Sequence, residues 1–193
     1  MKHLSLLIVV LMFSFLQAQE EENPSFRYNP NGLSPREVTV EVTGMTKETM
    51  HSKAKEWLEE KFKDPDEVTD KDDDEDDKGS PEDKKKTKKL RFKGATSNVI
   101  CFTEDDSYTC EDVNYTIQLK FFDGKYTFKP VKLSYKRPGK KKTSIKFNQS
   151  SFHTSGQLKK GYKKVASQIE DLFNKMNRSL NNYLTGKAQE DEW

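Results

Sequence analysis

The chain has 193 residues, of which 34% are charged and 32% hydrophobic, with 34 Lys and Arg against 32 Asp and Glu. Globular proteins usually contain about 45–50% apolar and about 25% charged residues, so part of this chain is expected to lie outside a packed core. The single long apolar run stands at the start, which excludes a membrane protein with several spans. The formal net charge of +2 argues against a protein that binds polyanions over its whole surface.

Residues 1–18 have the pattern of a secretory signal peptide. Lys2 precedes an apolar run from Leu4 to Leu16, and Ala18 is the small residue before a polar stretch. We expect cleavage after Ala18 and an exported mature protein, periplasmic or extracellular, with no transmembrane segment after cleavage. An uncleaved N-terminal anchor is the alternative, although the run is shorter than the roughly 20 residues that span a bilayer.

A flexible leader is predicted at residues 19–35, because this segment is polar and contains three prolines and an Asn-Gly pair. From Val38 to Thr43, valines alternate with polar residues in the period-two pattern of a half-buried strand. The folded part of the chain is expected to be a single domain over 36–185.

A helix is predicted over about 47–63. Thr46 is a suitable N-cap, and Glu48 places a negative charge in the first turn. The Asp-Pro pair at 64–65 ends the helical pattern. Apolar residues recur between these ends at helical spacing, namely Met50, Ala54, Trp57, Leu58 and Phe62.

Two blocks of opposite charge follow this helix. Residues 64–83 contain twelve acidic residues and two lysines, whereas residues 84–93 contain seven basic residues and no acidic ones. This composition predicts a disordered charged insert at 64–88. Aspartates alternate between Asp72 and Asp76 as in a calcium loop, but the glycine of an EF-hand loop is missing. Weak cation binding by the insert is the alternative.

Strands are predicted at 89–96 and 99–102, and the strongest hairpin signal is the Asp-Gly pair at 123–124, which fits a type I′ turn. This turn would place apolar residues opposite each other on one face, so the turn and the register agree. After Pro130 the apolar phase shifts by one residue, which predicts a bulge. The expected apolar pairs are Phe121–Tyr126, Leu119–Phe128 and Ile117–Pro130.

A long helix is predicted over about 157–185, with Ser155 as its cap and Gly186 as its C-terminal stop. Its apolar stripe includes Ile169 and Phe173. A polar tail follows at 186–193.

The two cysteines, Cys101 and Cys110, are predicted to form one disulfide. A hairpin centred on residues 105–106 would place them opposite each other, and export would bring them into an oxidising compartment. Two free thiols are the alternative. No metal site is predicted, because two thiolates without a nearby histidine supply only half of a zinc shell.

The sequence contains none of the common catalytic motifs, so we predict no catalytic residues and no cofactor. The mature chain has two histidines, His51 and His153, on which the alternative hypothesis of an exported hydrolase-like enzyme depends. Basic clusters occur at 84–93, 136–146 and 159–164. Their neighbouring aromatics lie on apolar stripes, and the acidic block would compete with phosphates for the lysines, so no nucleic-acid partner is expected.

Two segments carry a resemblance to a known family. Residues 45–58 include an Ala-x-x-Trp helix, and residues 115–128 include an Asp-Gly-Lys-Tyr hairpin. Over about 36–135 the chain resembles a secreted bacterial domain of unknown function with a TATA-binding-protein-like (TBP-like) fold. The resemblance implies that fold and a location in the cell envelope. It supplies no catalytic residues, and a fold shared with a DNA-binding protein does not imply DNA binding.

We therefore predict an α+β fold in which both helices pack on one face of a curved antiparallel sheet. The predicted function is an exported, non-catalytic binding or interaction module of the bacterial cell envelope. The groove between the sheet and the long helix would take an unknown protein or a small apolar ligand. The predicted core consists of Trp57, Leu58, Phe62, Leu119, Phe121, Tyr126, Phe128, Ile169 and Phe173.

Overall fold

The computed structural model describes residues 24–62, 87–104, 106–137 and 141–188. The predicted signal peptide lies outside these ranges, and within them no helix is long and apolar enough to cross a membrane. The elements are β1 (Arg27–Asn29), β2 (Gly32–Ser34), β3 (Val38–Glu41), α2 (Lys47–Lys61), β4 (Lys88–Glu104), β5 (Ser107–Phe122), β6 (Lys125–Tyr135), β7 (Thr143–Ile145), β8 (His153–Thr154), β9 (Gln157–Leu158) and α4 (Val165–Thr185).

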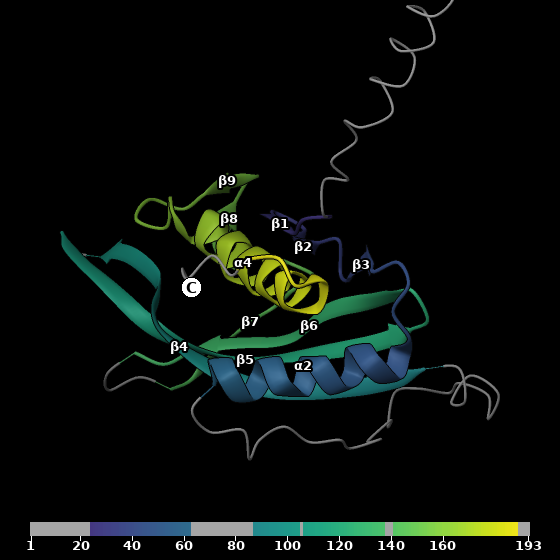
Figure 1. Cartoon of the computed structure of the whole chain (residues 1–193). Helices are drawn as coiled ribbons and strands as arrows, with labels where there is room; N and C mark the ends of the chain where they lie inside the picture. The colour runs from purple at the N-terminus through teal and green to yellow at the C-terminus, as the bar shows by residue number, and fades with distance from the viewer. Residues whose placement is uncertain (1–23, 63–86, 105, 138–140, 189–193) are drawn as a thin grey trace, which may run out of the picture.

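A curved antiparallel sheet organises the molecule, with strand order β3-β6-β5-β4 and β7 paired to β6 (Figure 1). Alternate residues of the long strands, such as Leu90 and Phe92 of β4, are buried in one core with residues of both helices. Helices α2 and α4 also contact each other. The predicted α+β fold, with two helices on one face of an antiparallel sheet, is therefore confirmed.

The β5–β6 hairpin turns at Asp123-Gly124 with the predicted register, but the predicted type I′ turn is wrong, because that type needs a positive φ at both central residues and only Gly124 has one, at 80°. Phe121 pairs with Tyr126, and Leu119 pairs with Phe128. The register shifts between Thr116 and Ile117, where the apolar phase predicted a bulge. In contrast, the two short strands predicted at 89–96 and 99–102 are one long strand, β4, with an irregularity between Thr96 and Ile100.

The predicted flexible leader is wrong for residues 24–35. This segment forms the β1–β2 hairpin, and Phe26 and Leu33 are buried. The Phe26 N–H donates to Asn174 Oδ1 at 2.7 Å, and the Tyr28 N–H donates to Glu170 Oε1 at 2.8 Å. Proline and Asn-Gly here make the turn of a small hairpin that is bound to α4.

Helix α4 begins at Val165, so the predicted start at 157 and the predicted Ser155 cap are also wrong. Ser155 has φ 51° and lies in the turn between β8 and β9. Gly161 has φ +91°, which a helix cannot accommodate, and a Cβ there would clash with the carbonyl of Thr103. The predicted stop is confirmed, since Gly186 has the left-handed conformation at the C-cap.

Helix α2 is capped by Thr46, whose side chain accepts from the Thr49 N–H as predicted. The helix ends at Lys61, and the C-cap Phe62 is only partly buried, so Phe62 belongs to the edge of the core. The other eight predicted core residues are buried. The insert predicted at 64–88 extends too far, because Lys88 opens β4; residues 63–86 lie outside the described ranges.

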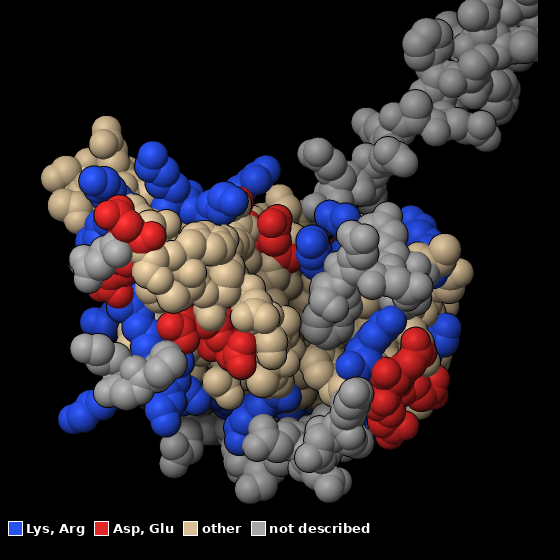
Figure 2. Space-filling view, turned by 90° about the vertical axis from the view of Figure 1, so that its left-hand side faces the viewer, with Lys and Arg blue, Asp and Glu red and all other residues tan. Residues whose placement is uncertain are grey.

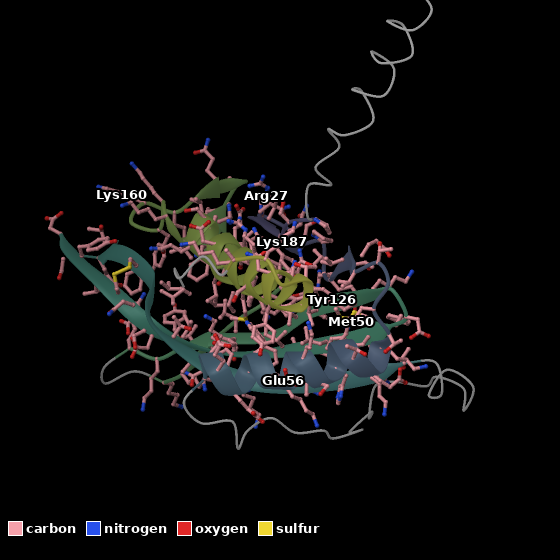
Figure 3. All side chains as sticks on the ribbon, viewed as in Figure 1. Arg27, Met50, Glu56, Tyr126, Lys160 and Lys187 are labelled. Carbon is pink, nitrogen blue, oxygen red and sulfur yellow. A yellow bond between two sulfur atoms is a disulfide. The ribbon has the colours of Figure 1, made fainter. Side chains whose placement is uncertain are left out.

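Buried polar atoms in the core find partners on the helices. The Tyr126 hydroxyl donates to Asn177 Oδ1 at 2.9 Å, and the Trp57 Nε1–H donates to Ser179 Oγ at 3.1 Å. Figure 3 shows Tyr126 and Met50 in the layer between the sheet and the helices, whereas Glu56 points away from it. These two hydrogen bonds connect α2 and β6 to the same stretch of α4.

Stability is expected to fall as the pH rises above about 10. Burial raises the pKa of Tyr115 to about 12 and also raises the pKa of Tyr126. An unfolded tyrosine ionises near pH 10, so these phenols lose protons more readily when the chain is unfolded, and the loss of stability should run from about pH 10 to 12. Urea unfolding at a series of pH values measures this slope.

The Tyr115→Phe variant is the control for the alkaline effect, since it should show a shallower fall of unfolding free energy over the same range. Absorbance near 295 nm reports tyrosinate directly. If all seven tyrosines of the folded protein ionised together near pH 10, the expected burial effect would be refuted.

Candidate functional site

The two histidines of the hydrolase hypothesis lie in separate places. The His51 ring, on α2, packs edge-on against Phe121 with centroids 5.7 Å apart. His153 lies in β8, where Nδ1 is 2.6 Å from Ser150 Oγ. Among the described residues, no hydrogen bond or ion pair joins His153 to a carboxylate.

Ser150 and His153 form the contact that most resembles a nucleophile and its base. Ser150 Oγ also accepts from the Phe152 N–H at 3.2 Å, so the hydroxyl closes a local turn. A catalytic triad needs a third group that orients the histidine, and a buried carboxylate usually supplies it. The contact as it stands is therefore explained by the turn.

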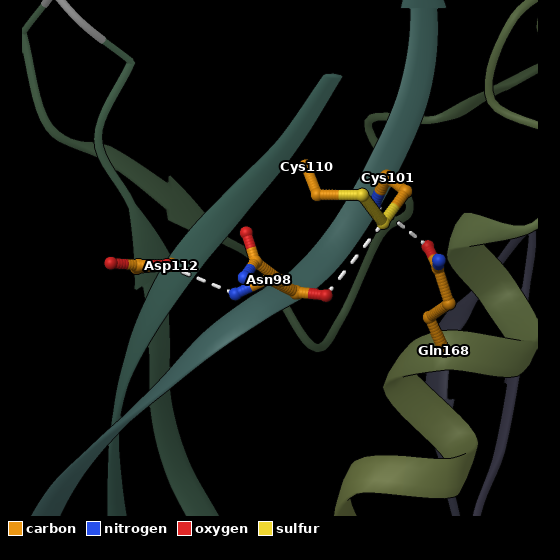
Figure 4. Close-up of a disulfide and its surroundings, with 5 residues drawn as sticks. All are labelled: Asn98, Cys101, Cys110, Asp112 and Gln168. Atoms are coloured by element: carbon orange, nitrogen blue, oxygen red, sulfur yellow. Dashed lines mark hydrogen bonds between the residues drawn. A yellow bond between two sulfur atoms is a disulfide. The ribbon is translucent and has the colours of Figure 1, made fainter. Parts of the chain in front are cut away.

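The disulfide is present as predicted and joins two neighbouring strands. Cys101 of β4 is directly opposite Cys110 of β5 and bonded to it (Figure 4). The Cys101 N–H donates to Gln168 Oε1 of α4 at 3.0 Å. On the preceding irregular segment, the Asn98 N–H donates to Asp112 Oδ1 at 2.9 Å. The bond thus clips the far end of the β4–β5 hairpin where it meets α4.

Removal of this disulfide with the Cys101→Ser/Cys110→Ser double variant is expected to lower the unfolding free energy by about 2–3 kcal/mol. The cross-link closes a short loop and restricts the unfolded chain. Urea unfolding of the oxidised protein, the reduced protein and the double variant measures the difference. Equal stability of all three forms would contradict the expectation.

A cluster of side chains around Arg137 holds together the same end of the molecule. The Arg137 guanidinium lies 4.1 Å from the Phe102 ring centroid, and it donates to Glu104 Oε2 at 2.7 Å and to the Tyr162 hydroxyl at 2.8 Å. The Phe102 and Tyr162 rings stack with centroids 5.2 Å apart. These contacts join the end of β6, β4 and the loop before α4, so the cluster has a clear structural role.

A cleft of about 750 Å³ opens beside this cluster, between the β4–β5 tip and the loop before α4. It is lined by Lys160, Lys163 and Lys164, and by Tyr108, which is 59% exposed. Figure 2 looks at this side of the molecule, where Lys and Arg side chains surround a central area of uncharged residues and acidic side chains form small groups. Glu104 and Asp106 also line the cleft, so it carries charges of both signs and has no clear preference for one ligand class.

The predicted binding groove between the sheet and α4 is occupied by the protein's own side chains. The Phe26 ring lies 6.0 Å from the Phe128 ring and 6.1 Å from the Phe173 ring, and all three residues are fully buried. These aromatic contacts are typical of a closed core. The candidate surface is therefore the opposite face of the sheet.

We call this surface the open face; it is the side of β4, β5 and β6 that points away from α2 and α4. The register aligns its residues in rows across the three strands. Every charged side chain in the rows from Lys89 to Thr96 of β4 is a cation. The rows are Lys89–Lys120–Thr127, Arg91–Gln118–Lys129, Lys93–Thr116–Lys132 and Ala95–Asn114–Ser134.

A cavity of about 610 Å³ lies over the last two of these rows. Three cations, Lys93, Lys132 and Lys142, line it together with the polar groups of Asn114 and Ser134. The lining therefore offers ammonium, amide and hydroxyl groups, which are donors suited to carboxylate or other anionic oxygen atoms.

The edge of this cavity is shaped by a glycine. Gly94 is opposite Tyr115, and a Cβ at position 94 would lie 2.6 Å from the Tyr115 ring. The ring therefore covers the backbone of the edge strand. Phe62, at the end of α2, also lines the cavity.

The open face is a feature that the sequence analysis missed. The sequence analysis assigns residues 84–93 to a basic block and does not consider the lysines of β5 and β6. Aligning the two hairpins would have placed Lys93 and Lys132 in one row, because the Asp-Gly turn and the cysteine pair fix both registers. Among the described residues, no group of His, Cys, Asp and Glu could hold a metal ion.

Two solved structures share this fold. A DUF4468 family protein from Bacteroides ovatus ATCC 8483 has a TM-score of 0.53 at 14% identity, over 81% of this chain and 88% of that chain. A TBP-like protein from Parabacteroides distasonis ATCC 8503 has a TM-score of 0.50 at 11% identity, over 79% of this chain and 92% of that chain. No curated protein matches.

A family model described as a domain of unknown function (DUF4468) with TBP-like fold matches residues 37–136. The matched segment runs from the residue before β3 to the residue after β6, and so includes the open face. More than half of the chain is matched, and the family predicted from the helix and hairpin motifs is confirmed. The chain belongs to the DUF4468 family of domains of unknown function with a TBP-like fold.

Proposed function

We propose that the protein is an exported, non-catalytic interaction module of the cell envelope that binds an acidic macromolecule, most simply an acidic protein segment, through its open face. The proposal depends on one observation, the rows of cations on the helix-free side of the sheet. Arg91, Lys93 and Lys132 are exposed and lie in two neighbouring rows, so they offer anionic groups three positive charges on one surface.

The nature of the surface favours an acidic partner over an apolar one. Tyr108 is the one large hydrophobic residue that is exposed among the described residues. It lies at the β4–β5 tip, beyond the rows of cations. The cavity on the open face contains three lysines and the polar side chains of Asn114, Thr116 and Ser134, beside the rings of Phe62 and Tyr115. Complementary charge would also speed association and make it sensitive to salt.

Fluorescence anisotropy with labelled poly-glutamate tests this function on the mature chain. The triple variant Arg91→Glu/Lys93→Glu/Lys132→Glu should lose at least about tenfold in affinity at low salt, since three attractive contacts become repulsive. The matched control is Lys160→Glu/Lys163→Glu/Lys175→Glu, which changes the net charge equally at exposed positions elsewhere. Equal losses in both variants would show that only net charge matters and would refute the open-face site.

Export and the absence of catalysis need separate tests. N-terminal sequencing of the protein from the envelope fraction should begin at Gln19, and a cytoplasmic protein that begins at Met1 would contradict export. The Ser150→Ala and His153→Ala variants should leave poly-glutamate binding unchanged. A hydrolytic activity on a simple ester that both variants abolish would establish the enzyme alternative instead.

A further inference from the structure

We infer that the acidic partner binds as an extended strand that pairs with the edge of β4, so that its carboxylates lie beside Arg91 and Lys93 on the open face. This inference rests on the proposed function, since it assigns a binding geometry to the same partner. β4 is the last strand in the order β3-β6-β5-β4 and pairs only with β5 among the described strands. An edge strand presents N–H and C=O groups to which another chain can add.

The alternation of the strands shows which residues of β4 direct their backbone outward. In an antiparallel sheet, successive residues direct their N–H and C=O groups alternately to one neighbouring strand and to the other. Pro130 of β6, which has no N–H, is opposite Ile117 of β5, so the backbone groups of Ile117 are directed to β4. The partner of Ile117 there is Phe92. Phe92 therefore bonds to β5, and the backbone groups of Arg91 and Lys93 point outward.

The outward groups between Arg91 and Ala95 are available to a partner. Arg91, Lys93 and Ala95 are all exposed. In the part of the chain that the structure describes, no hydrogen bond joins the outward N–H or C=O groups of these three residues to another element. This stretch of β4 can therefore accept a further strand.

The far end of the same edge is closed by the protein itself. The Cys101 N–H donates to the side chain of Gln168 of α4, and the Thr103 N–H donates to the Gly161 carbonyl at 2.9 Å. These bonds use outward groups of β4 beyond its irregular segment. A partner strand is thus limited to the end of β4 that carries the cations.

Charge decides which kind of chain fits this edge. Arg91 and Lys93 are two residues apart, so both side chains lie on the open face, whereas Phe92 between them is buried. An added strand would place two of its own residues, also two apart, directly opposite them. Opposite charges in such cross-strand pairs are favourable. A partner segment with a carboxylate at every second residue therefore matches the edge.

A second copy of this chain matches the edge poorly. In the antiparallel registers centred between Arg91 and Lys93, at least one cation of β4 would be directly opposite a cation of the copy. Like charges in such positions are destabilising. Lysines on an edge strand commonly prevent edge-to-edge association for this reason. The same charges attract an acidic strand.

The test uses the mature chain and a fluorescein-labelled peptide of four Glu-Thr repeats. Two modified peptides of equal charge are N-methylated, one at every glutamate and the other at every threonine. Glutamates opposite the cations would supply the N–H groups that bond to β4, whereas the threonine N–H groups would point away. Glutamate methylation should weaken binding by at least about tenfold, and threonine methylation by less than about threefold. Equal affinity of the two methylated peptides would overturn the inference.

Amide hydrogen exchange followed by NMR locates the bound peptide. The amides of Arg91, Lys93 and Ala95 should exchange at least about tenfold more slowly in the saturated complex, whereas that of Phe92, already bonded to β5, should change by less than about twofold. Ala95→Pro removes one outward donor without changing the charge and should weaken binding by about tenfold. If this variant does not fold, the exchange rates of the natural sequence decide.

The outcomes separate the inference from the proposed function. Binding of poly-glutamate that leaves the three amides unprotected refutes strand addition and leaves the open face as a binding site. Equal binding of a Gln-Thr peptide, with the amides protected, refutes the acidic partner and with it the proposed function. Protection of the same amides without peptide, at concentrations where sedimentation shows a dimer, assigns the edge to a second copy and overturns the inference. Binding of neither poly-glutamate nor any peptide refutes both proposals.

Discussion

Replacement of Trp57 with alanine is expected to lower the free energy of unfolding by about 3–5 kcal/mol, the usual cost of emptying a large buried aromatic site. Trp57 is fully buried, and its ring lies 5.9 Å from those of both Phe62 and Phe92, measured between centroids. Its Nε1–H also donates to Ser179 Oγ of α4. The substitution would therefore weaken contacts between α2, β4 and α4 at the same time.

Thermal or urea unfolding measures this effect, and the melting temperature should fall by about 10 °C for a protein of this size. Glu56→Ala on the exposed side of α2 is the matched control and should change stability by less than about 0.5 kcal/mol. Fluorescence of Trp57 provides a check on the premise. A spectrum typical of a fully water-exposed indole would mean that the assigned helix face is wrong.

The elements that the sequence predicted best are those where several local signals agree. In the β5–β6 hairpin, the Asp-Gly turn, the alternation of apolar residues and the phase shift after Pro130 all require one register. Cys101 and Cys110 were placed opposite each other by the same reasoning about a turn. Helix α2 combined a cap, an apolar stripe and a breaker.

The errors arise where local composition and tertiary packing disagree. Leu158 and Tyr162 continue the helical spacing of α4 toward its N-terminus, but Gly156 and Gly161 both have φ near +80° to +91°, so the chain turns there. Leu158 packs on the core from β9 and Tyr162 from the loop before α4. Periodicity alone cannot distinguish a helical stripe from a loop that returns to the same surface.

The open face shows a second reason why prediction from the sequence was incomplete. Each lysine of the strands is unremarkable in sequence, because polar residues are expected on the solvent side of a half-buried strand. Their concentration becomes visible only when the β4–β5 and β5–β6 registers are combined, which places Arg91 in the same row as Lys129.

The N-terminal hairpin is the part of the fold that the sequence analysis predicted as a flexible leader, and its role in stability can be tested directly. Replacement of Phe26 with alanine is expected to destabilise the protein by about 3–5 kcal/mol. A residue in a flexible leader would cost nothing when truncated. Phe26 instead is fully buried between Phe128 of the sheet and Phe173 of α4.

The backbone around Phe26 explains why the segment stays in place. Its N–H donates to Asn174 Oδ1 and its carbonyl accepts from Asn174 Nδ2 at 3.0 Å, so a single side chain of α4 satisfies both groups. Asn174→Ala should therefore cost about 1–3 kcal/mol through the loss of these two bonds. Arg27→Ala is the control, because the side chain is 72% exposed and its pair with Glu170 is weak at 3.5 Å.

Urea unfolding of Phe26→Ala, Asn174→Ala and Arg27→Ala decides between a leader and a structural strand. Phe26→Ala should lower the free energy of unfolding most, Asn174→Ala should lower it less, and Arg27→Ala should leave it nearly unchanged. Limited proteolysis adds an independent readout, since Phe26→Ala should allow cleavage near residues 24–35 before the rest of the domain opens. Natural stability in the Phe26→Ala protein would show that the hairpin is not needed to close the core.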